Sequence, residues 1–132
     1  HKIGMQMLET NDAASGMDYL RKAIAIQEAI AADLPVDAEI RQELAAGYIG
    51  LGYALEDSGD AAGALESHRK ALAVREALVK ADPGNSKLVR GLVITDINLG
   101  RALVLSGNLQ GGLASNRKAM TRCESLLAES PS

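Results

Sequence analysis

The sequence has very few aromatic residues: three Tyr, no Phe and no Trp among 132 residues. All-β folds draw heavily on aromatic and β-branched side chains, so this shortage argues against them. The core must instead be built from Ala, Leu, Ile, Val and Met, which suits closely packed helices. Hydrophobic residues make up 47% and charged residues 23%, which is enough apolar material for a folded domain.

Cysteine, basic runs and long apolar runs are scarce as well. Cys123 is the single cysteine, which excludes an internal disulfide and a cysteine metal cluster, and we expect a free surface thiol. The net charge is -3 and the charges are interspersed, so nucleic acid is not an expected partner. No apolar run approaches the roughly 20 residues that cross a bilayer, and we expect no membrane insertion of this segment.

The chain repeats itself with a period of 48 residues. Arg-Lys-Ala begins at residues 21, 69 and 117, Leu-Gly at residues 51 and 99, and Ser-Gly at residues 58 and 106. We therefore divide a single domain, 1–132, into a partial unit 1–36 and two full units, 37–84 and 85–132. The first residue is His1 rather than Met, and we expect the chain to be a fragment of a larger protein.

Each full unit predicts two amphipathic helices. In the turn between them, Gly59 ends one helix and Asp60 caps the next, as Gly107 and Asn108 do in the following unit. Pro83 separates the units, because proline cannot continue a helix. In the first helix of the last unit, the expected packing residues are Leu88, Leu92, Ile94, Leu99, Ala102 and Leu103. The predicted fold is all-α, a superhelical solenoid of about six antiparallel helices at 1–10, 13–33, 37–57, 61–81, 85–106 and 109–129.

Residues 48–60, followed by Ala64, His68, Ala71 and Leu72, resemble the tetratricopeptide repeat. The family's usual aromatic positions are replaced by Leu55, Leu103, His68 and Asn116. A unit of 48 rather than about 34 residues adds roughly two turns to each helix. This elongated form is similar to arrays in kinesin light chains and in regulatory regions attached to bacterial Ser/Thr kinases. Recurrence of Gly52 as Gly100 predicts close helix–helix approach, and His68 is expected to pack between helices.

The resemblance implies that the first helix of each pair lines a concave groove. Aligned positions that differ between units are the candidate partner contacts, and they are Tyr53, Arg101, Asn98, Glu56, Asp57, Met5 and Arg90. Tyr53 and Arg101 are the strongest of them, because Tyr and Arg are enriched among binding hot spots. No catalytic constellation, cofactor motif or metal-ligand spacing is found, so we do not expect an enzyme.

The function expected from this resemblance is that of a scaffold or adaptor that binds a protein or peptide in the groove. The alternative is a regulatory or sensor region of a larger bacterial signalling protein such as a Ser/Thr kinase. We expect a cytoplasmic location, or an extracytoplasmic one if a membrane span precedes the array. The last helix carries an apolar stripe that includes Leu113 and Met120, which either further repeats or another chain would cover. Self-association through the terminal helices is therefore a possible interaction.

Overall fold

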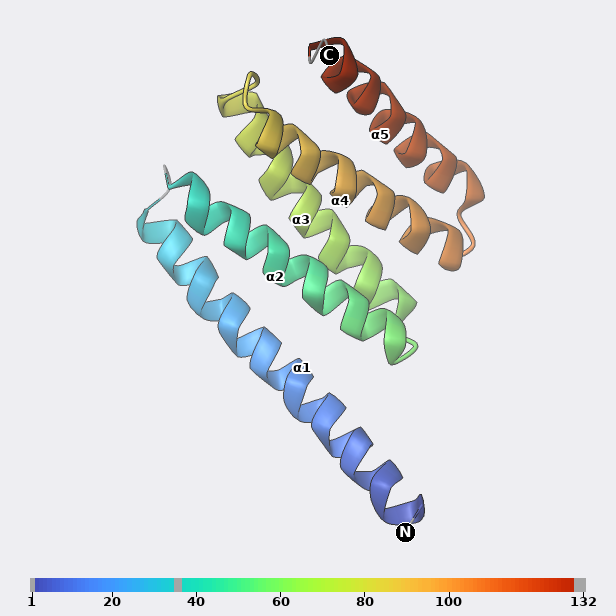
Figure 1. Ribbon diagram of the computed structural model, residues 1–132. Coiled ribbons are helices and arrows are strands. Elements are labelled where there is room, and N and C mark those ends of the chain that lie inside the picture. The colour runs from blue at the N-terminus through green and yellow to red at the C-terminus, as the bar shows by residue number, and fades with distance from the viewer. Residues whose placement is uncertain (1, 35–36, 130–132) are drawn as a thin grey trace.

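A computed structural model describes residues 2–34 and 37–129, with side chains from residue 15 onward. The described residues form five helices: α1 (Lys2–Asp33), α2 (Ala38–Asp57), α3 (Ala61–Ala81), α4 (Ser86–Leu105) and α5 (Leu109–Glu129). Consecutive helices run antiparallel and pack side by side, with α1 and α5 at the two edges (Figure 1). No strand occurs in the described part of the chain. The expected all-α superhelix is confirmed.

The helix count differs from the prediction, because one continuous helix, α1 (Lys2–Asp33), takes the place of the two helices predicted at 1–10 and 13–33. The two later turns need a glycine in the left-handed region: φ is 88° at Gly59 and 93° at Gly107. The corresponding position in the first copy is Asn11, which lies within α1. Because this residue has a Cβ, the left-handed conformation that the turn requires costs more free energy than a helical conformation does. The helix therefore continues through this position.

The other helix limits follow from local capping. Asp60 Oδ1 accepts a hydrogen bond from Gly63 N at 2.9 Å, and Asn108 Oδ1 accepts one from Gly111 N at 2.9 Å. Asp37 caps α2 and Asn85 caps α4 in the same manner. Such caps satisfy backbone N–H groups that have no partner inside the helix. The four predicted helices from 37 onward therefore begin and end within a residue of their predicted limits.

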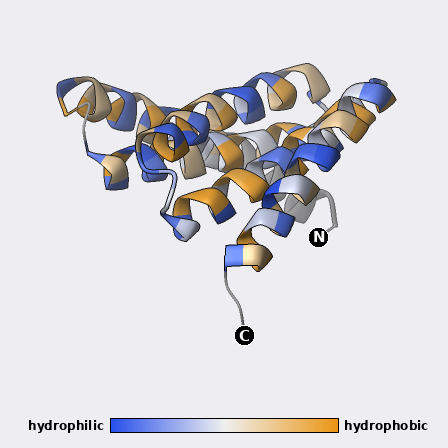
Figure 2. Cartoon of the chain, turned by 90° about the horizontal axis from the view of Figure 1, so that it is seen from above, coloured by the Kyte–Doolittle hydropathy of each residue, from blue (hydrophilic) through white to orange (hydrophobic). Residues whose placement is uncertain are grey.

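Small side chains let the helices approach closely. Ala45, Ala64 and Ala71 are fully buried, and a Cβ placed on Gly52 would lie 2.5 Å from His68 Cε1. A Cβ on Gly100 would lie 2.7 Å from Asn116 Oδ1, so both recurring glycines mark close contacts, as predicted. Each helix alternates hydrophobic and hydrophilic residues along its length (Figure 2). Close packing of small residues thus replaces the aromatic core that the sequence lacks.

Polar groups are also buried between the helices. His68 is fully buried, which confirms its expected place in the packing. Asp96 of α4 is 1% exposed and forms an ion pair with Arg122 of α5. Cys123 is exposed, as predicted for a surface thiol. The buried ion pair was not predicted, because Asp96 aligns with Tyr48 of the preceding unit. The repeat pattern therefore gave no indication of a buried charge at this position.

Candidate partner-binding site

Four of the predicted groove residues meet where α2 and α4 lie next to each other. The Tyr53 hydroxyl donates a hydrogen bond to Asn98 Oδ1 at 2.7 Å, and Arg101 Nη2 donates to Glu56 Oε2 at 2.8 Å. The Arg101 guanidinium carbon lies 5.0 Å from the centre of the Tyr53 ring, a cation–π distance. We call Tyr53, Glu56, Asn98 and Arg101 the Tyr53–Arg101 cluster. It joins the two helices through one continuous polar network.

His68 supports this cluster from α3. Its Nε2 lies 3.0 Å from Glu56 Oε1, and its ring meets the Tyr53 ring edge-on at a centroid distance of 5.7 Å. Burial lowers the pKa of His68 below 6.5, Glu56 opposes this shift in part, and Arg101 adds to it. At neutral pH the imidazole is therefore neutral and donates its Nε2–H to Glu56. The buried ring holds Glu56 in the position that Arg101 needs.

The four members of the cluster differ in accessibility. Tyr53 is 41% exposed, the Arg101 side chain is 42% exposed and the Glu56 side chain is 13% exposed. Asn98 is only 3% exposed, so it accepts the hydrogen bond of the Tyr53 hydroxyl from the buried side of the cluster and does not face a partner. Tyr53 and Arg101 are the two side chains that this cluster offers to a ligand.

The remaining predicted contacts lie outside the cluster. Asp57 is exposed at the last residue of α2, and Arg90 is exposed near the start of α4. Arg90 and Arg101 are 11 residues apart, which separates them by about 16 Å along the helix axis. Met5 belongs to α1 but falls outside the residues whose side chains are described. The structure thus brings four of the seven predicted residues into one cluster.

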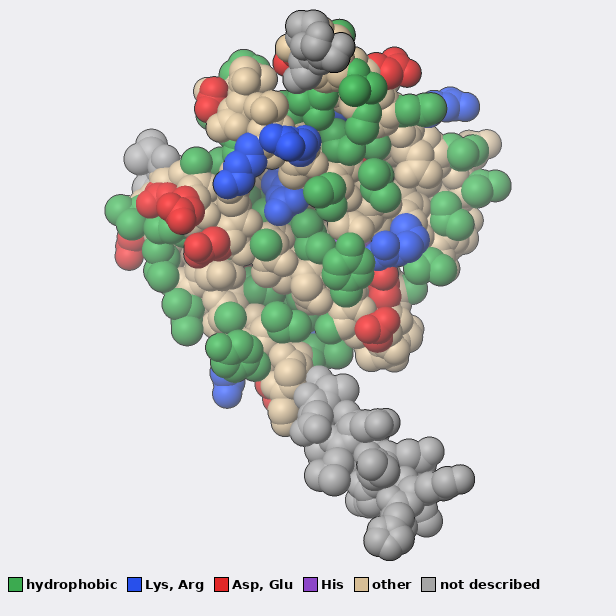
Figure 3. Space-filling model, viewed as in Figure 1, with side chains coloured by type: hydrophobic (Ala, Val, Ile, Leu, Met, Phe, Trp, Pro, Cys, Tyr) green, Lys and Arg blue, Asp and Glu red, His purple; other side chains and the backbone are tan. Residues whose placement is uncertain are grey.

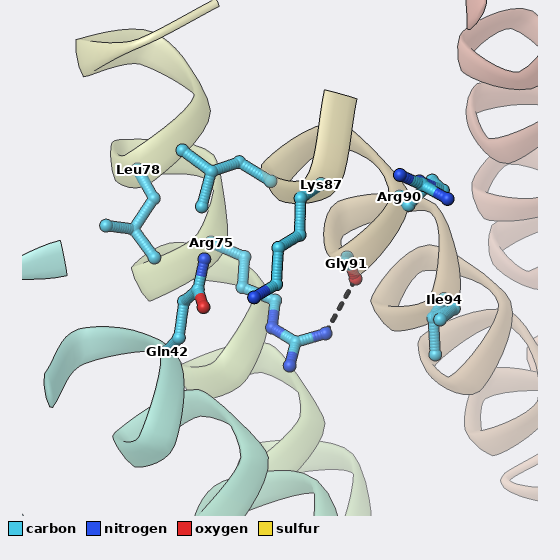
Figure 4. A pocket seen from close by; sticks show the side chains of 8 residues that line it. Gln42, Arg75, Leu78, Lys87, Arg90, Gly91 and Ile94 are labelled. Atoms are coloured by element: carbon cyan, nitrogen blue, oxygen red, sulfur yellow. Dashed lines mark hydrogen bonds between the residues drawn. The ribbon is translucent and has the colours of Figure 1, made fainter. Parts of the chain in front are cut away.

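A cleft of about 470 Å³ opens where α2, α3 and the first turns of α4 meet (Figure 4). We call it the Arg75 cleft, and its lining residues are Gln42, Arg75, Leu78, Lys87, Leu88, Arg90, Gly91 and Ile94. The side chains of Gln42, Arg75 and Lys87 point toward one another, and Arg90 and Ile94 of α4 lie to the right of them in the view (Figure 4). Three of the lining residues are basic and none is acidic.

Arg75 is the central cation of this cleft. Its Nη1 donates hydrogen bonds to the Gly91 carbonyl oxygen at 2.8 Å and to Thr95 Oγ1 at 3.2 Å. Burial lowers the pKa of Arg75, but a guanidinium remains charged at neutral pH. Arg75 takes part in none of the ion pairs between described residues. Glu39 and Glu43 line a neighbouring hollow that Arg75 also reaches. Arg75 is therefore a partly desolvated cation that forms no ion pair with a described residue, and two carboxylates line the hollow next to it.

Two isoleucines on α4 are exposed between the two sites. Ile94 is 53% exposed and Ile97 is 49% exposed. Ile94 was predicted to pack in the core, and this was wrong, because it is exposed at the edge of the Arg75 cleft. The sequence held a signal: Leu88, Leu92, Leu99 and Leu103 keep helical spacing, whereas Ile94 falls two residues after Leu92. The space-filling view shows hydrophobic side chains between two groups of basic ones on this face (Figure 3).

The described residues contain no group of three His, Cys, Asp or Glu side chains placed to hold a metal ion. None of the described helices combines the length and apolarity that a membrane span requires. What the α2–α4 face does offer is open aromatic, aliphatic and cationic side chains on rigid helices. Such a surface suits contact with another polypeptide.

Stacked helical hairpins with recurring Gly–Asx turns place the chain among the α-helical repeat proteins. Residues 44–83 match the family model of the tetratricopeptide repeat. The matched segment runs from the middle of α2 through α3, so this hairpin matches a tetratricopeptide repeat. No curated protein matches the chain. The likeness to kinesin light chains stays a prediction.

Proposed function

We propose that the face formed by α2 and α4 binds an extended segment of a partner protein that carries apolar residues between acidic ones. Tetratricopeptide repeats in general mediate protein–protein interaction, and the family match supports that broad role. The composition of this face supports the finer assignment. The same binding property would serve an adaptor or the regulatory region of a larger signalling protein.

The observation that carries the proposal is the charge pattern of the face. Exposed Ile94 and Ile97 lie between Arg90 at one end and Arg101 at the other. The roughly 16 Å between the two arginines along α4 matches about five residues of extended chain. A segment with two central apolar residues and acidic residues on both sides complements this pattern in length and charge.

Arg75 adds an anchoring point at one end. A carboxylate in the Arg75 cleft would meet a guanidinium that already has a fixed position, because Gly91 and Thr95 hold its Nη1. Charge-assisted hydrogen bonds to arginine are stronger than neutral ones, and partial burial reduces their screening by salt. We therefore expect an acidic side chain of the ligand to bind in this cleft.

Fluorescein-labelled peptides of about eight residues, with two apolar residues between acidic pairs, test the proposal by fluorescence anisotropy. Arg75→Gln should weaken binding about tenfold, while Arg69→Gln, at an exposed residue of the same helix, should leave the affinity unchanged. Binding should also weaken as salt is raised. Equal affinity for peptides whose acidic residues are replaced by Gln, or equal effects of the two variants, would contradict the proposed function.

A further inference from the structure

A second hollow opens beside the Arg75 cleft, and most of its lining belongs to α2. Its volume is about 660 Å³, within the range of about 300–1,000 Å³ that ligand sites commonly have. We call it the Glu43 hollow, and its lining residues are Glu39, Gln42, Glu43, Ala46, Arg75, Asn85 and Lys87. It is bounded by α2, α3 and the start of α4, so it lies within the array and not at either edge.

The Glu43 hollow has charges of both signs on its walls. Glu39 and Glu43 lie one turn apart on α2, about 6 Å along the helix axis. Arg75 of α3 and Lys87 of α4 supply the cations. None of these four residues takes part in an ion pair between described residues. Opposite charges therefore line one hollow without pairing across it, and each sign is available to a charged group of a ligand.

The packing of the helices does not require the two carboxylates. Both side chains are exposed, and one period of 48 residues later their positions are occupied by Lys87 and Gly91. Glu39 lies in the first turn of α2, where a negative charge stabilises the helix N-terminus. Glu43 lies beyond that turn, so the helix dipole does not account for it. Exposed positions that differ between units, on a scaffold whose packing recurs, are suited to determine binding specificity.

A segment bound in the Arg75 cleft also reaches the Glu43 hollow. Gln42, Arg75 and Lys87 line both cavities, and their side chains converge at the boundary between them (Figure 4). Successive side chains of an extended chain point to opposite sides. When an acidic residue of the segment faces Arg75 and α4, the next residue therefore faces α2. The carboxylates there repel a second acidic residue and attract a basic one.

We propose that the Glu43 hollow selects a Lys or Arg of the partner segment, directly next to the acidic residue that binds in the Arg75 cleft. This inference rests on the proposed function of the α2–α4 face and specifies the partner sequence further. The preferred segment has a basic residue, an acidic residue, two apolar residues and an acidic residue, in this order along one of the two chain directions. Glu39 and Glu43 then discriminate against a segment that is acidic throughout.

Labelled peptides that differ at one position test this selection by fluorescence anisotropy. Each has two apolar residues between acidic pairs, except that the outermost acidic residue at one end is replaced by Lys or by Gln. The replacement is made at each end in turn, so that both chain directions are tested. At one end, the Lys peptide should bind about three- to fivefold more tightly than the Gln peptide, because exposed charge pairs contribute modestly. The difference should shrink as salt is raised.

Reversal of one charge in the protein identifies the carboxylate. Glu43→Lys should abolish the preference for Lys and favour the peptide that keeps its outermost acidic residue by about threefold. Glu76→Lys makes the same charge change at an exposed residue of α3 that lines neither cavity, and it should keep the preference for Lys. Glu39→Gln should reduce this preference about twofold, since one of the two carboxylates remains.

The outcomes separate this inference from the proposed function. Equal affinities of the Lys and Gln peptides at both ends, with Arg75→Gln still weakening both, would overturn the selection of a basic residue and leave the proposed function standing. Equal effects of Glu43→Lys and Glu76→Lys on the preference would also overturn the selection, because the effect would then follow the net charge of the protein. Absence of binding by every peptide would overturn both proposals.

Discussion

Replacing Gly52 by alanine tests the close packing that takes the place of an aromatic core. The added Cβ would lie 2.5 Å from His68 Cε1, 2.7 Å from Nε2 and 2.9 Å from Nδ1. His68 cannot easily move away, because it is fully buried and its Nε2 is held 3.0 Å from Glu56 Oε1. Overpacking of this kind costs about 1–3 kcal/mol. Alanine has a higher helix propensity than glycine, which offsets this cost by about 1 kcal/mol.

Gly50 provides the matched control two residues earlier in α2. A Cβ there would meet only Leu20 Cδ2, at an ordinary contact distance of 3.9 Å. Gly50→Ala should therefore stabilise the protein by about 1 kcal/mol through helix propensity alone. The two variants should differ in free energy of unfolding by about 1–3 kcal/mol, with Gly52→Ala the less stable.

Urea unfolding followed by far-ultraviolet circular dichroism measures this difference. In thermal unfolding, each kcal/mol should appear as a shift of about 4 °C in Tm for a domain of this size. The cost of Gly52→Ala should shrink when His68 is also replaced by alanine, because the atoms that meet the new Cβ are then gone. Equal stabilities for Gly50→Ala and Gly52→Ala would refute the reasoning.

Two further predictions concern buried charge. Because burial lowers the pKa of His68 below 6.5, the unfolded chain binds a proton at this residue more readily than the folded protein does, so stability should fall as the pH drops below 6.5. Urea unfolding at several pH values should show a shallower dependence for His68→Gln, and an unchanged slope would contradict this. Arg122→Met leaves Asp96, which is 1% exposed, without its cation and should destabilise the protein by about 3–5 kcal/mol in thermal unfolding. Arg117→Met, at an exposed position with no ion pair to a described residue, should change stability by less than about 0.5 kcal/mol, and similar losses in both variants would rule out the role given to the buried pair.

Much of the fold could be predicted from local patterns. The 48-residue period, the Gly–Asx turns and Pro83 placed the four helices from 37 onward, because capping and helix termination depend on residues close together in sequence. The same reasoning predicted a turn between residues 10 and 13, where the structure has a continuous helix. Asn11 occupies the place of the turn glycine, and a stricter requirement for glycine there would have predicted the continuous helix α1.

The candidate site was predictable in part. Aligning the repeats identified Tyr53, Glu56 and Arg101, because a shared helical spacing places equivalent residues at equivalent positions on neighbouring helices. Alignment could not show that Asn98 is buried beneath Tyr53 or that Ile94 is exposed. Those outcomes depend on how far each helix is rotated toward its neighbours, which no single helix encodes.

Local sequence patterns thus account for the helical class, the repeat period and the positions of the later turns. The packing of helices against each other decided the rest: the Arg75 cleft and the Asp96–Arg122 ion pair. Capping acts within a few residues, whereas burial and charge pairing join residues that are tens of positions apart. The tyrosines illustrate both contributions. Their scarcity in the sequence indicated a helical core, whereas only the packing of the helices placed Tyr48 against Glu28 and Tyr53 against Arg101.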